Sequence, residues 1–591
     1  MKSVTMKKSL GISFIMAIGI QLSCHKADLN IPPSGLVDES KLANQKGVEG
    51  LLIGAYALLD GFTLDTYDDA FRFGGGTSNW IYGSICGSEA YKGGYDEGDQ
   101  SDILSIEKFS ATATNSKLAQ KWTLTYAGVE RANEVLRMMG KAKDIRDGDR
   151  KRISAEARFL RGFYHFEAIK VFHKIPYVDE NVTYVNGNYF LPNDTLIWPA
   201  IENDFRYAME NLPEVMNAPG RVNKYAAEAY LAKTYLFQFG DRQKLLKAKT
   251  LLDELIQRGV NASGNKYELQ NLYGNNFNLS FKNSGEAVFS AQISVNDGAQ
   301  GWNGNIADIL NYPVNGGPGG CCSFFQPSQY LVNHFKTDPL TGLPDLDHFN
   351  DVDVKNDNGI GSDKPFVPYD GPLDPRIDWT LGRRSIPYLD WGPHPGQLWI
   401  RNTTFGPYSP LKNTYYKEQQ DKFTDKAFWT TGASANNINL LRFADILLWA
   451  AEVEVEVGSL DKARDYVNQI RIRAANQDGW VKNPDGSNAA NYKTGIYSQS
   501  WTDPLFARKA VRYERMLELG MEGHRFFDLV RWGIADTEIY LYLKEEQKKR
   551  AHLVGAQFQK GKSEYFPIPQ TQIDLSVGKD GIQKLKQNPG Y

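Results

Sequence analysis

The stretch from Arg512 to Gly533 reads RYERMLELGMEGHRFFDLVRWG and sets charged side chains among large apolar ones. Glu514 and Glu518 are four residues apart, so both lie on one face of the predicted helix. Such a carboxylate pair suits acid–base catalysis, but Arg515 and Arg525 follow closely and offer partners of opposite charge. We interpret the stretch as interlocked ion pairs and hydrogen bonds between packed helices, whose role is structural.

Helical patterns continue on both sides of this stretch. The predicted helices cover residues 39–62, 117–139, 154–172, 198–212, 224–239, 242–258, 440–457, 460–475 and 503–519. Short Gly-containing turns join 224–239 to 242–258 and 440–457 to 460–475, which favours antiparallel hairpins with the small-residue pattern of tetratricopeptide repeats.

The segment from about 267 to 431 has a different character. It is rich in Gly, Pro, Asn and aromatic residues and shows no persistent helical period, and 287–295 is its one clear strand pattern. A long stretch of this kind is usually functional. We therefore predict a mainly α fold in which a helical scaffold, about 39–260 and 440–591, carries a large irregular region, about 267–431, with few short strands.

The N-terminal residues predict export and a lipid anchor. Three lysines precede an apolar run at 10–22, as in a secretory signal peptide. Cys24 follows directly, as at a bacterial lipoprotein processing site, although Gln21 stands where an aliphatic residue is usual. We predict a signal peptide at 1–23 and a single domain at 24–591 that is lipidated on Cys24. The alternative is an ordinary signal peptide beside a chance cysteine.

Composition argues against several classes of function. The chain has 67 Lys+Arg and 70 Asp+Glu, a net charge of −3, so bulk charge does not attract it to nucleic acid. Cys86, Cys321 and Cys322 cannot form a disulfide framework. A disulfide between the adjacent Cys321 and Cys322 would be strained, so we predict that both are small apolar residues in a Gly-rich turn.

No cofactor is predicted. The eight histidines form no two-histidine helical motif, and the Gly-rich runs do not match phosphate-binding loops. The acidic residues of 345–359 have a spacing similar to a calcium loop but fail the EF-hand pattern at several positions. We interpret 345–359 as a solvated acidic loop, with calcium binding as the alternative.

Four motifs in order resemble the SusD/RagB family. They are AEARFLRGFY at 155–164, LLRFADILL at 440–448, the stretch 512–533, and FPIP at 566–569 followed by QNPGY at 587–591. Together with the lipoprotein signal, the resemblance extends from one end of the chain to the other.

The resemblance implies a fold, a function and a partner. It implies four tetratricopeptide-like helix pairs in an outer-membrane lipoprotein of Bacteroidetes that faces the cell exterior. Such a protein binds an oligosaccharide or polysaccharide and delivers it to a SusC-like TonB-dependent barrel transporter, without catalysis. Some relatives take peptides, so a peptide-binding lid is the first alternative. A glycoside hydrolase, for which no carboxylate pair stands out, and an adhesin are alternatives of other classes.

Aromatic and polar residues in irregular segments are the predicted ligand-binding residues. An aromatic ring matches the apolar face of a sugar, while amides and carboxylates match its hydroxyls. The predicted residues are Trp80, Tyr82, Glu89, Trp302, Asn303, Tyr312 and Trp391. The family resemblance implies that ligand-contacting residues come from both parts of the chain concerned, the segment after the first helix and the irregular region. The alternative is that these aromatics fill small cores under long loops.

Overall fold

The computed structural model describes residues 39–62 and 73–591. The predicted signal peptide at 1–23 and the predicted lipidation site at Cys24 lie outside the described residues. Within the described residues, no helix combines the length and apolar character needed to cross a membrane.

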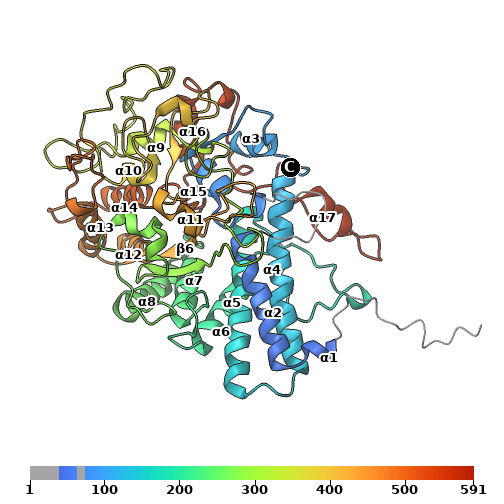
Figure 1. The fold of residues 1–591 in the computed structure, drawn as a ribbon. Helices are drawn as coiled ribbons and strands as arrows, with labels where there is room; N and C mark the ends of the chain where they lie inside the picture. The colour runs from blue at the N-terminus through green and yellow to red at the C-terminus, as the bar shows by residue number, and fades with distance from the viewer. Residues whose placement is uncertain (1–38, 63–72) are drawn as a thin grey trace, which may run out of the picture.

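The N-terminal half is built from long helices that pack in chain order. They are α1 (Glu39–Leu42), α2 (Gln45–Ala57), α3 (Ser101–Glu107), α4 (Ser116–Lys141), α5 (Asp147–Phe172), α6 (Trp198–Asn211), α7 (Lys224–Leu236) and α8 (Arg242–Arg258). From α4 to α8 each helix packs on the next, and α2 lies against α4 (Figure 1). Asn115, Asn223 and Asp241 cap α4, α7 and α8 by accepting hydrogen bonds from backbone N–H groups of the first turn.

The C-terminal half returns to the same scaffold. Its helices are α12 (Phe443–Val457), α13 (Leu460–Ala474), α14 (Pro504–Leu519), α15 (Arg525–Arg531), α16 (Ala535–Glu546) and α17 (Gln570–Leu575). Helix α12 packs on α8, α13 and α14, so the two helical parts of the chain meet directly. The mainly α fold predicted from the sequence is confirmed.

The irregular region contains more regular structure than the sequence pattern indicates. Its short elements are β2 (Ala287–Ala291), β3 (Phe324–Pro327), α9 (Gln329–His334), α10 (Ile377–Thr380), β4 (Leu381–Gly382), β5 (Ser409–Pro410) and α11 (Gln420–Phe423). Helices of four to six residues are too short to produce a helical period. The predicted strand at 287–295 is found, but it ends at Ala291.

Three two-stranded antiparallel sheets join distant parts of the chain. β1 (Ala90–Gly93) pairs with β3, β4 pairs with β5, and β2 pairs with β6 (Ile438–Arg442). The pairing of β6 corrects one prediction: the helix expected from residue 440 begins only at Phe443. Leu441 lies opposite Phe289 in the ladder, so this part of the predicted helix is extended backbone.

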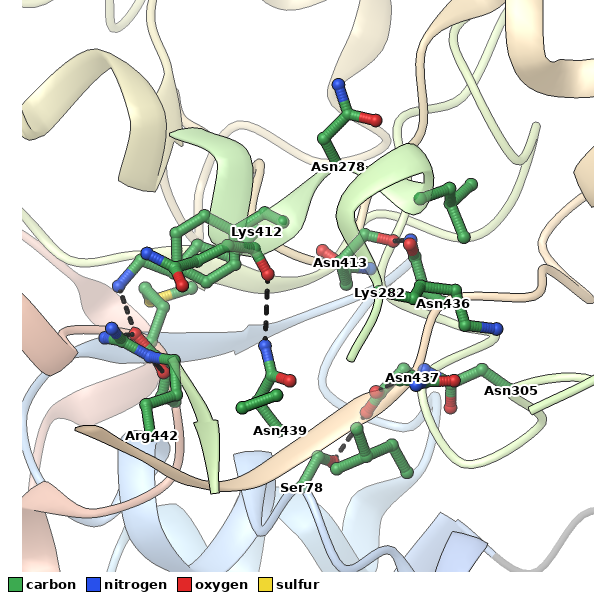
Figure 2. Close-up of a pocket in the computed structure, with 18 of the residues that line it drawn as sticks. Ser78, Asn278, Lys282, Asn305, Lys412, Asn413, Asn436, Asn437, Asn439 and Arg442 are labelled. Carbon is green, nitrogen blue, oxygen red and sulfur yellow. Dashed lines mark hydrogen bonds and ion pairs between the residues drawn. The ribbon is translucent and has the colours of Figure 1, made fainter. Parts of the chain in front are cut away.

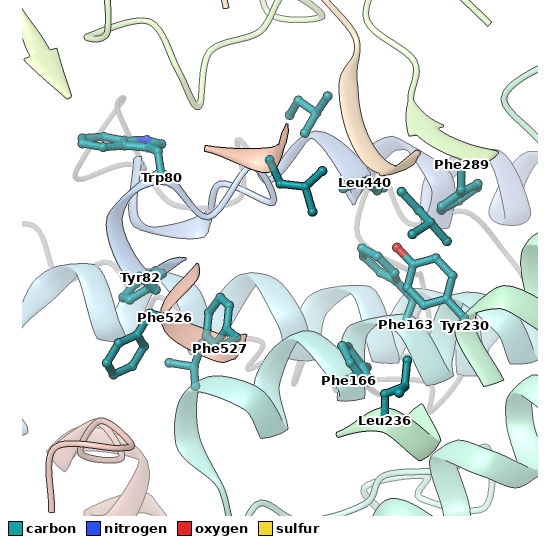
Figure 3. Close-up of a cluster of buried hydrophobic side chains, with 14 of the residues drawn as sticks. Trp80, Tyr82, Phe163, Phe166, Tyr230, Leu236, Phe289, Leu440, Phe526 and Phe527 are labelled. Carbon is teal, nitrogen blue, oxygen red and sulfur yellow. The ribbon is translucent and has the colours of Figure 1, made fainter. Parts of the chain in front are cut away.

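Aromatic side chains fill the core between the scaffold and the β2–β6 sheet. Phe163 on α5, Tyr230 on α7 and Phe289 on β2 meet edge to face, with ring centroids 5.6 to 6.3 Å apart (Figure 3). Such contacts stabilise a core beyond the burial of apolar area. The core fixes the sheet, and the sheet in turn fixes one wall of the pocket described below.

The stretch from Arg512 to Gly533 forms ion pairs, as predicted, but Glu514 and Glu518 pair with arginines from other segments of the chain. Glu514 pairs with Arg376 at 2.7 Å and with Arg471 at 2.9 Å, and all three side chains are buried. Arg515 pairs with Asp528 at 2.8 Å. These contacts join α14 to α13, α15 and the irregular region, as the sequence predicts.

Two further predictions concern cysteines and acidic residues. The structure places a disulfide between the adjacent Cys321 and Cys322, where we predicted two small apolar residues in a Gly-rich turn. In the loop 345–359, Asp353 pairs with Lys549 and Asp357 lies 3.7 Å from Arg384. Among the described residues, no group of three His, Cys, Asp or Glu side chains converges as metal ligands.

Candidate functional site

A cavity of about 1000 Å³, counting its mouth open to solvent, lies beside the β2–β6 sheet. Its wall is contributed by the segments 276–284, 305–311, 410–413 and 436–442, together with Ser78, Trp80, Ala287, Phe325, Met521 and Glu522. Figure 2 shows side chains from these segments directed toward a common space. The wall therefore combines the irregular region with β6 and with the turn that follows α14.

Asparagine is the commonest residue type on this wall. The asparagines are Asn276, Asn278, Asn283, Asn305, Asn311, Asn413, Asn436, Asn437 and Asn439. Several bond to backbone and so hold the wall together. Asn413 donates to the Asn311 carbonyl at 2.8 Å, Asn436 donates to the Asn413 carbonyl at 2.6 Å, and Asn439 donates to the Asn276 carbonyl at 3.1 Å (Figure 2).

Two of these asparagines carry unsatisfied acceptors. Asn305 and Asn311 are 2% and 1% exposed, and neither Oδ1 atom has a hydrogen-bond partner among the described residues. A buried acceptor without a partner costs about 1–3 kcal/mol. A hydrogen-bond donor that reaches these two oxygens, from a water molecule or from a ligand, would remove that cost.

An acidic side chain lies next to them. Asp308 accepts hydrogen bonds from Ser78 Oγ at 2.6 Å and from Asn305 Nδ2 at 2.9 Å. Burial raises the pKa of Asp308 and outweighs the effect of both hydrogen bonds. The carboxyl thus orients the Asn305 amide and leaves its oxygen free for a ligand.

Aromatic and aliphatic surfaces face the same cavity. Trp80, Phe277, Leu279, Phe281 and Phe325 line it, and Phe281 is 45% exposed. A wall with both rings and amide groups can bind a ligand that has an apolar face and a polar edge.

The basic groups at one end of the cavity are mostly paired. Arg442 pairs with Glu286, Glu518 and Glu522 at 2.6 to 3.0 Å, and Lys412 pairs with Glu522 at 2.7 Å. Burial alone would raise the pKa of Glu522, but the two cations outweigh it and lower the pKa to about 2. Glu522 is therefore ionised and held in place, and it neutralises the charges beside it.

Of the predicted residues, Trp80 lines the cavity, but it is not an exposed platform. It begins a short π-helical turn, Trp80–Ile85, and is only 2% exposed. Its Nε1 donates to the Ala307 carbonyl at 3.1 Å, and its ring lies 5.7 Å from that of Phe325. The indole can be buried in the wall because the Ala307 carbonyl satisfies its one polar atom.

Tyr82 and Glu89 are buried behind this wall. The Tyr82 hydroxyl donates to the Lys117 carbonyl at 2.8 Å, and Glu89 accepts from the Met521 N–H at 3.1 Å. Burial raises the pKa of Glu89 to about 8. Figure 3 shows Tyr82 among core side chains, and neither Tyr82 nor Glu89 lines the cavity.

The remaining predicted residues lie elsewhere in the irregular region. Trp302 stacks on Phe62 with ring centroids 5.5 Å apart, and the exposed Asn303 donates to Asp297 at 2.8 Å. Tyr312 is buried and donates to the Asn413 carbonyl at 3.0 Å. None of the three lines the cavity. Their contact with a ligand stays a prediction, as it does for the other predicted residues.

Trp391 is half-buried and also lies outside the cavity wall. Its Nε1 donates to the Tyr415 carbonyl at 3.0 Å. The predicted aromatics that are well buried, Trp80, Tyr82 and Tyr312, share one feature, a polar atom bonded to a backbone carbonyl. That hydrogen bond lets a large ring be buried in the core. Composition alone does not indicate which aromatic side chains will find such a partner.

The asparagines of the wall were missed from the sequence. They are concentrated in the runs NNFN at 275–278 and NNIN at 436–439, which flank the two strands of the β2–β6 pair. The density of amides in these two segments was the available signal. What the sequence did not show is that β6 pairs with β2 and brings the two runs to one cavity.

Comparisons with known proteins agree with this architecture. A family model described as "SusD family" matches residues 285–591, and another described as "Starch-binding associating with outer membrane" matches residues 96–236. The chain is 24% identical to SusD-like protein P2 of Formosa agariphila, over 74% of this chain and 76% of that one. It is 27% identical to a SusD-like protein of Bacteroides ovatus, over 72% and 67%.

Solved structures share the fold. A SusD-like protein from Bacteroides fragilis superposes with a TM-score of 0.66 at 20% identity, covering 94% of this chain and 99% of that one. A surface glycan-binding protein A from Bacteroides thetaiotaomicron, solved in complex with laminarihexaose, gives 0.60 at 19% identity, covering 92% and 99%.

Proposed function

Because the chain belongs to the SusD family, we propose that it binds an oligosaccharide or polysaccharide at the cell surface and delivers it to a SusC-like TonB-dependent transporter. The proposed binding site is the asparagine-lined cavity. The proposed anchor is the lipid on Cys24, which would hold the protein on the outer membrane with its cavity facing the exterior. The name of the second matching family model supports the outer-membrane location.

The observation that carries the proposal is the pair of unsatisfied amide oxygens on Asn305 and Asn311. Sugar hydroxyls donate hydrogen bonds, and several hydroxyls surround each ring. The rings of Phe277 and Phe281 offer apolar surface for the C–H face of the same sugar. The relative solved with laminarihexaose supports a glycan ligand for this fold.

We propose binding without turnover. Glu522 is occupied by Arg442 and Lys412, and Asp308 is occupied by Ser78 and Asn305. A glycosidase needs two carboxyl groups that are available to the scissile bond from opposite sides. Both carboxyl groups named here instead maintain the cavity wall.

The proposal is tested by calorimetric titration of the full chain in detergent with a panel of oligosaccharides and a peptide digest. Saturable heat with one glycan class, and no shortened sugar products, is the expected result. Saturable heat with peptides alone would replace the glycan proposal by the peptide-binding alternative. Product formation would show an enzyme. Delivery is tested separately, by isolating the chain from its membrane together with a barrel transporter and measuring glycan uptake without the chain.

A further inference from the structure

Lys282 is the one basic residue on the cavity wall that lacks a carboxylate partner among the described residues. It follows the short turn Leu279–Phe281 and lines the cavity next to the exposed Phe281. The wall's other two basic residues, Lys412 and Arg442, are fully paired with glutamates. The unpaired acid of the wall, Asp308, forms no ion pair with Lys282 and bonds to Ser78 and Asn305 instead.

The ammonium group of Lys282 is held in a fixed position by backbone. Its Nζ atom donates to the Ile293 carbonyl at 3.0 Å and to the Ala435 carbonyl at 2.8 Å. Those carbonyls come from the segments next to β2 and β6, so the ammonium is tied to the sheet that forms the wall. A lysine has three N–H donors, so these two carbonyls leave one donor unused.

The surroundings of Lys282 leave its charge uncompensated. Burial lowers the pKa of Lys282 to about 8, and no acidic side chain raises it again. Removing a charge from water is costly unless an opposite charge takes the place of the water. A ligand anion placed in the cavity would supply that opposite charge through a charge-assisted hydrogen bond, which is stronger than a neutral one.

From this arrangement we infer that the cavity selects glycans with an anionic substituent, a uronic acid carboxylate or a sulfate ester, that binds to Lys282. The inference rests on the proposed function, because it specifies the class of glycan that the same cavity takes. The asparagine oxygens then accept hydrogen bonds from the sugar hydroxyls, while the Lys282 ammonium binds the anionic substituent. The net charge of the chain, −3, gives no sign of this preference because the charge that matters is local.

The test compares matched ligands that differ in charge alone. A uronic acid oligosaccharide is titrated beside its carboxyl-reduced form, and a sulfated oligosaccharide beside its desulfated form, into the full chain at low salt. We expect the charged member of one pair to bind about tenfold more tightly than its neutral counterpart, and the pair that shows the difference identifies the anion. For Lys282→Met the ratio should fall to near one, because the charged member should lose about tenfold more affinity than the neutral member.

Lys426→Met is the matched control, since Lys426 is exposed and lies outside the cavity wall. It removes the same charge and should leave the ratio unchanged. If Lys282→Met does not fold, the wild-type chain still gives a test, because raising the salt should weaken the charged member only.

Equal affinity for charged and neutral members in the wild-type chain would overturn the inference and leave glycan binding intact. A folded Lys282→Met that loses affinity equally for the charged and the neutral ligand would also overturn the inference. It would show that the lysine only supports the wall. Absence of binding to every member would instead overturn the proposed function.

Discussion

Glu518 is a buried carboxylate among several arginines, and Glu518→Gln should destabilise the fold. Three guanidinium groups contact its carboxylate: Arg473 at 2.6 Å, Arg442 at 3.0 Å and Arg376 at 3.2 Å. Burial alone would raise the pKa of Glu518, but these arginines outweigh it and hold the pKa below its usual range. The substitution keeps the shape of the side chain and removes the charge that three buried cations share.

The expected magnitude follows from the cost of leaving a buried charge uncompensated, about 3–5 kcal/mol. The entropy of unfolding is about 2.1 cal/mol/K per residue, which gives about 1.2 kcal/mol/K for a chain of 591 residues. The melting temperature should therefore fall by about 2–4 °C.

Scanning calorimetry of the two full chains at pH 7 measures this shift. Glu545→Gln is the matched control, because Glu545 pairs with Lys548 at the surface, where an ion pair contributes about 0–1 kcal/mol. Its melting temperature should stay within about 1 °C of the wild type. A Glu518→Gln protein that melts as late as this control would refute the structural reading of the ion pairs.

Three other substitutions have distinct expected outcomes. Arg525→Ala should lower stability by about 1–3 kcal/mol in urea unfolding, since Arg525 is nearly buried and pairs with the partly exposed Glu538 at 3.1 Å; an unchanged transition would contradict this. Trp80→Ala should lower the free energy of unfolding by about 3–5 kcal/mol, because buried packing is lost, and should also lower ligand affinity. Loss of affinity alone would show that the indole is less buried than we find. Acid should destabilise the chain as pH falls from about 6.5 toward 4. In this range histidines bind protons in the unfolded state, whereas the buried histidines of the folded state stay neutral. His165 is the best probe, since burial lowers its pKa to about 3 and its Nε2 accepts from the Val178 N–H. The melting temperature of His165→Gln should fall less steeply over that range than that of the wild type, and parallel curves would count against the linkage. The other histidines with pKa values lowered by burial to about 3 or 4 are His334, His394 and His524.

The helical scaffold could be predicted from the sequence because its signals are local. The helix predicted at 503–519 is α14, and the Asp503 side chain caps it by accepting from the Leu505 N–H. The pair α7–α8 begins and ends within a few residues of the predicted bounds for the same reason. Repeating apolar positions, caps and turns fix such helices without distant partners.

The binding site was harder to predict because it depends on contacts that are distant in sequence. Leu440 and Leu441 read as helix, but they pair with β2, which lies about 150 residues earlier. That pairing brings Asn276 and Asn439 into contact. The exposure of an aromatic ring such as Tyr312 is equally non-local, because a backbone carbonyl of Asn413 satisfies its hydroxyl.

The central claim, that the asparagine-lined cavity binds a hydroxyl-rich ligand, is tested most directly by Asn311→Leu. Among the described residues the Asn311 side-chain oxygen has no partner, so a leucine of similar size should leave the melting temperature unchanged or higher. The same substitution should weaken binding of the glycan found in the titration panel about tenfold, because the ligand loses a buried hydrogen-bond acceptor. Unchanged affinity in a protein of unchanged stability would contradict the claim and show that the ligand binds elsewhere.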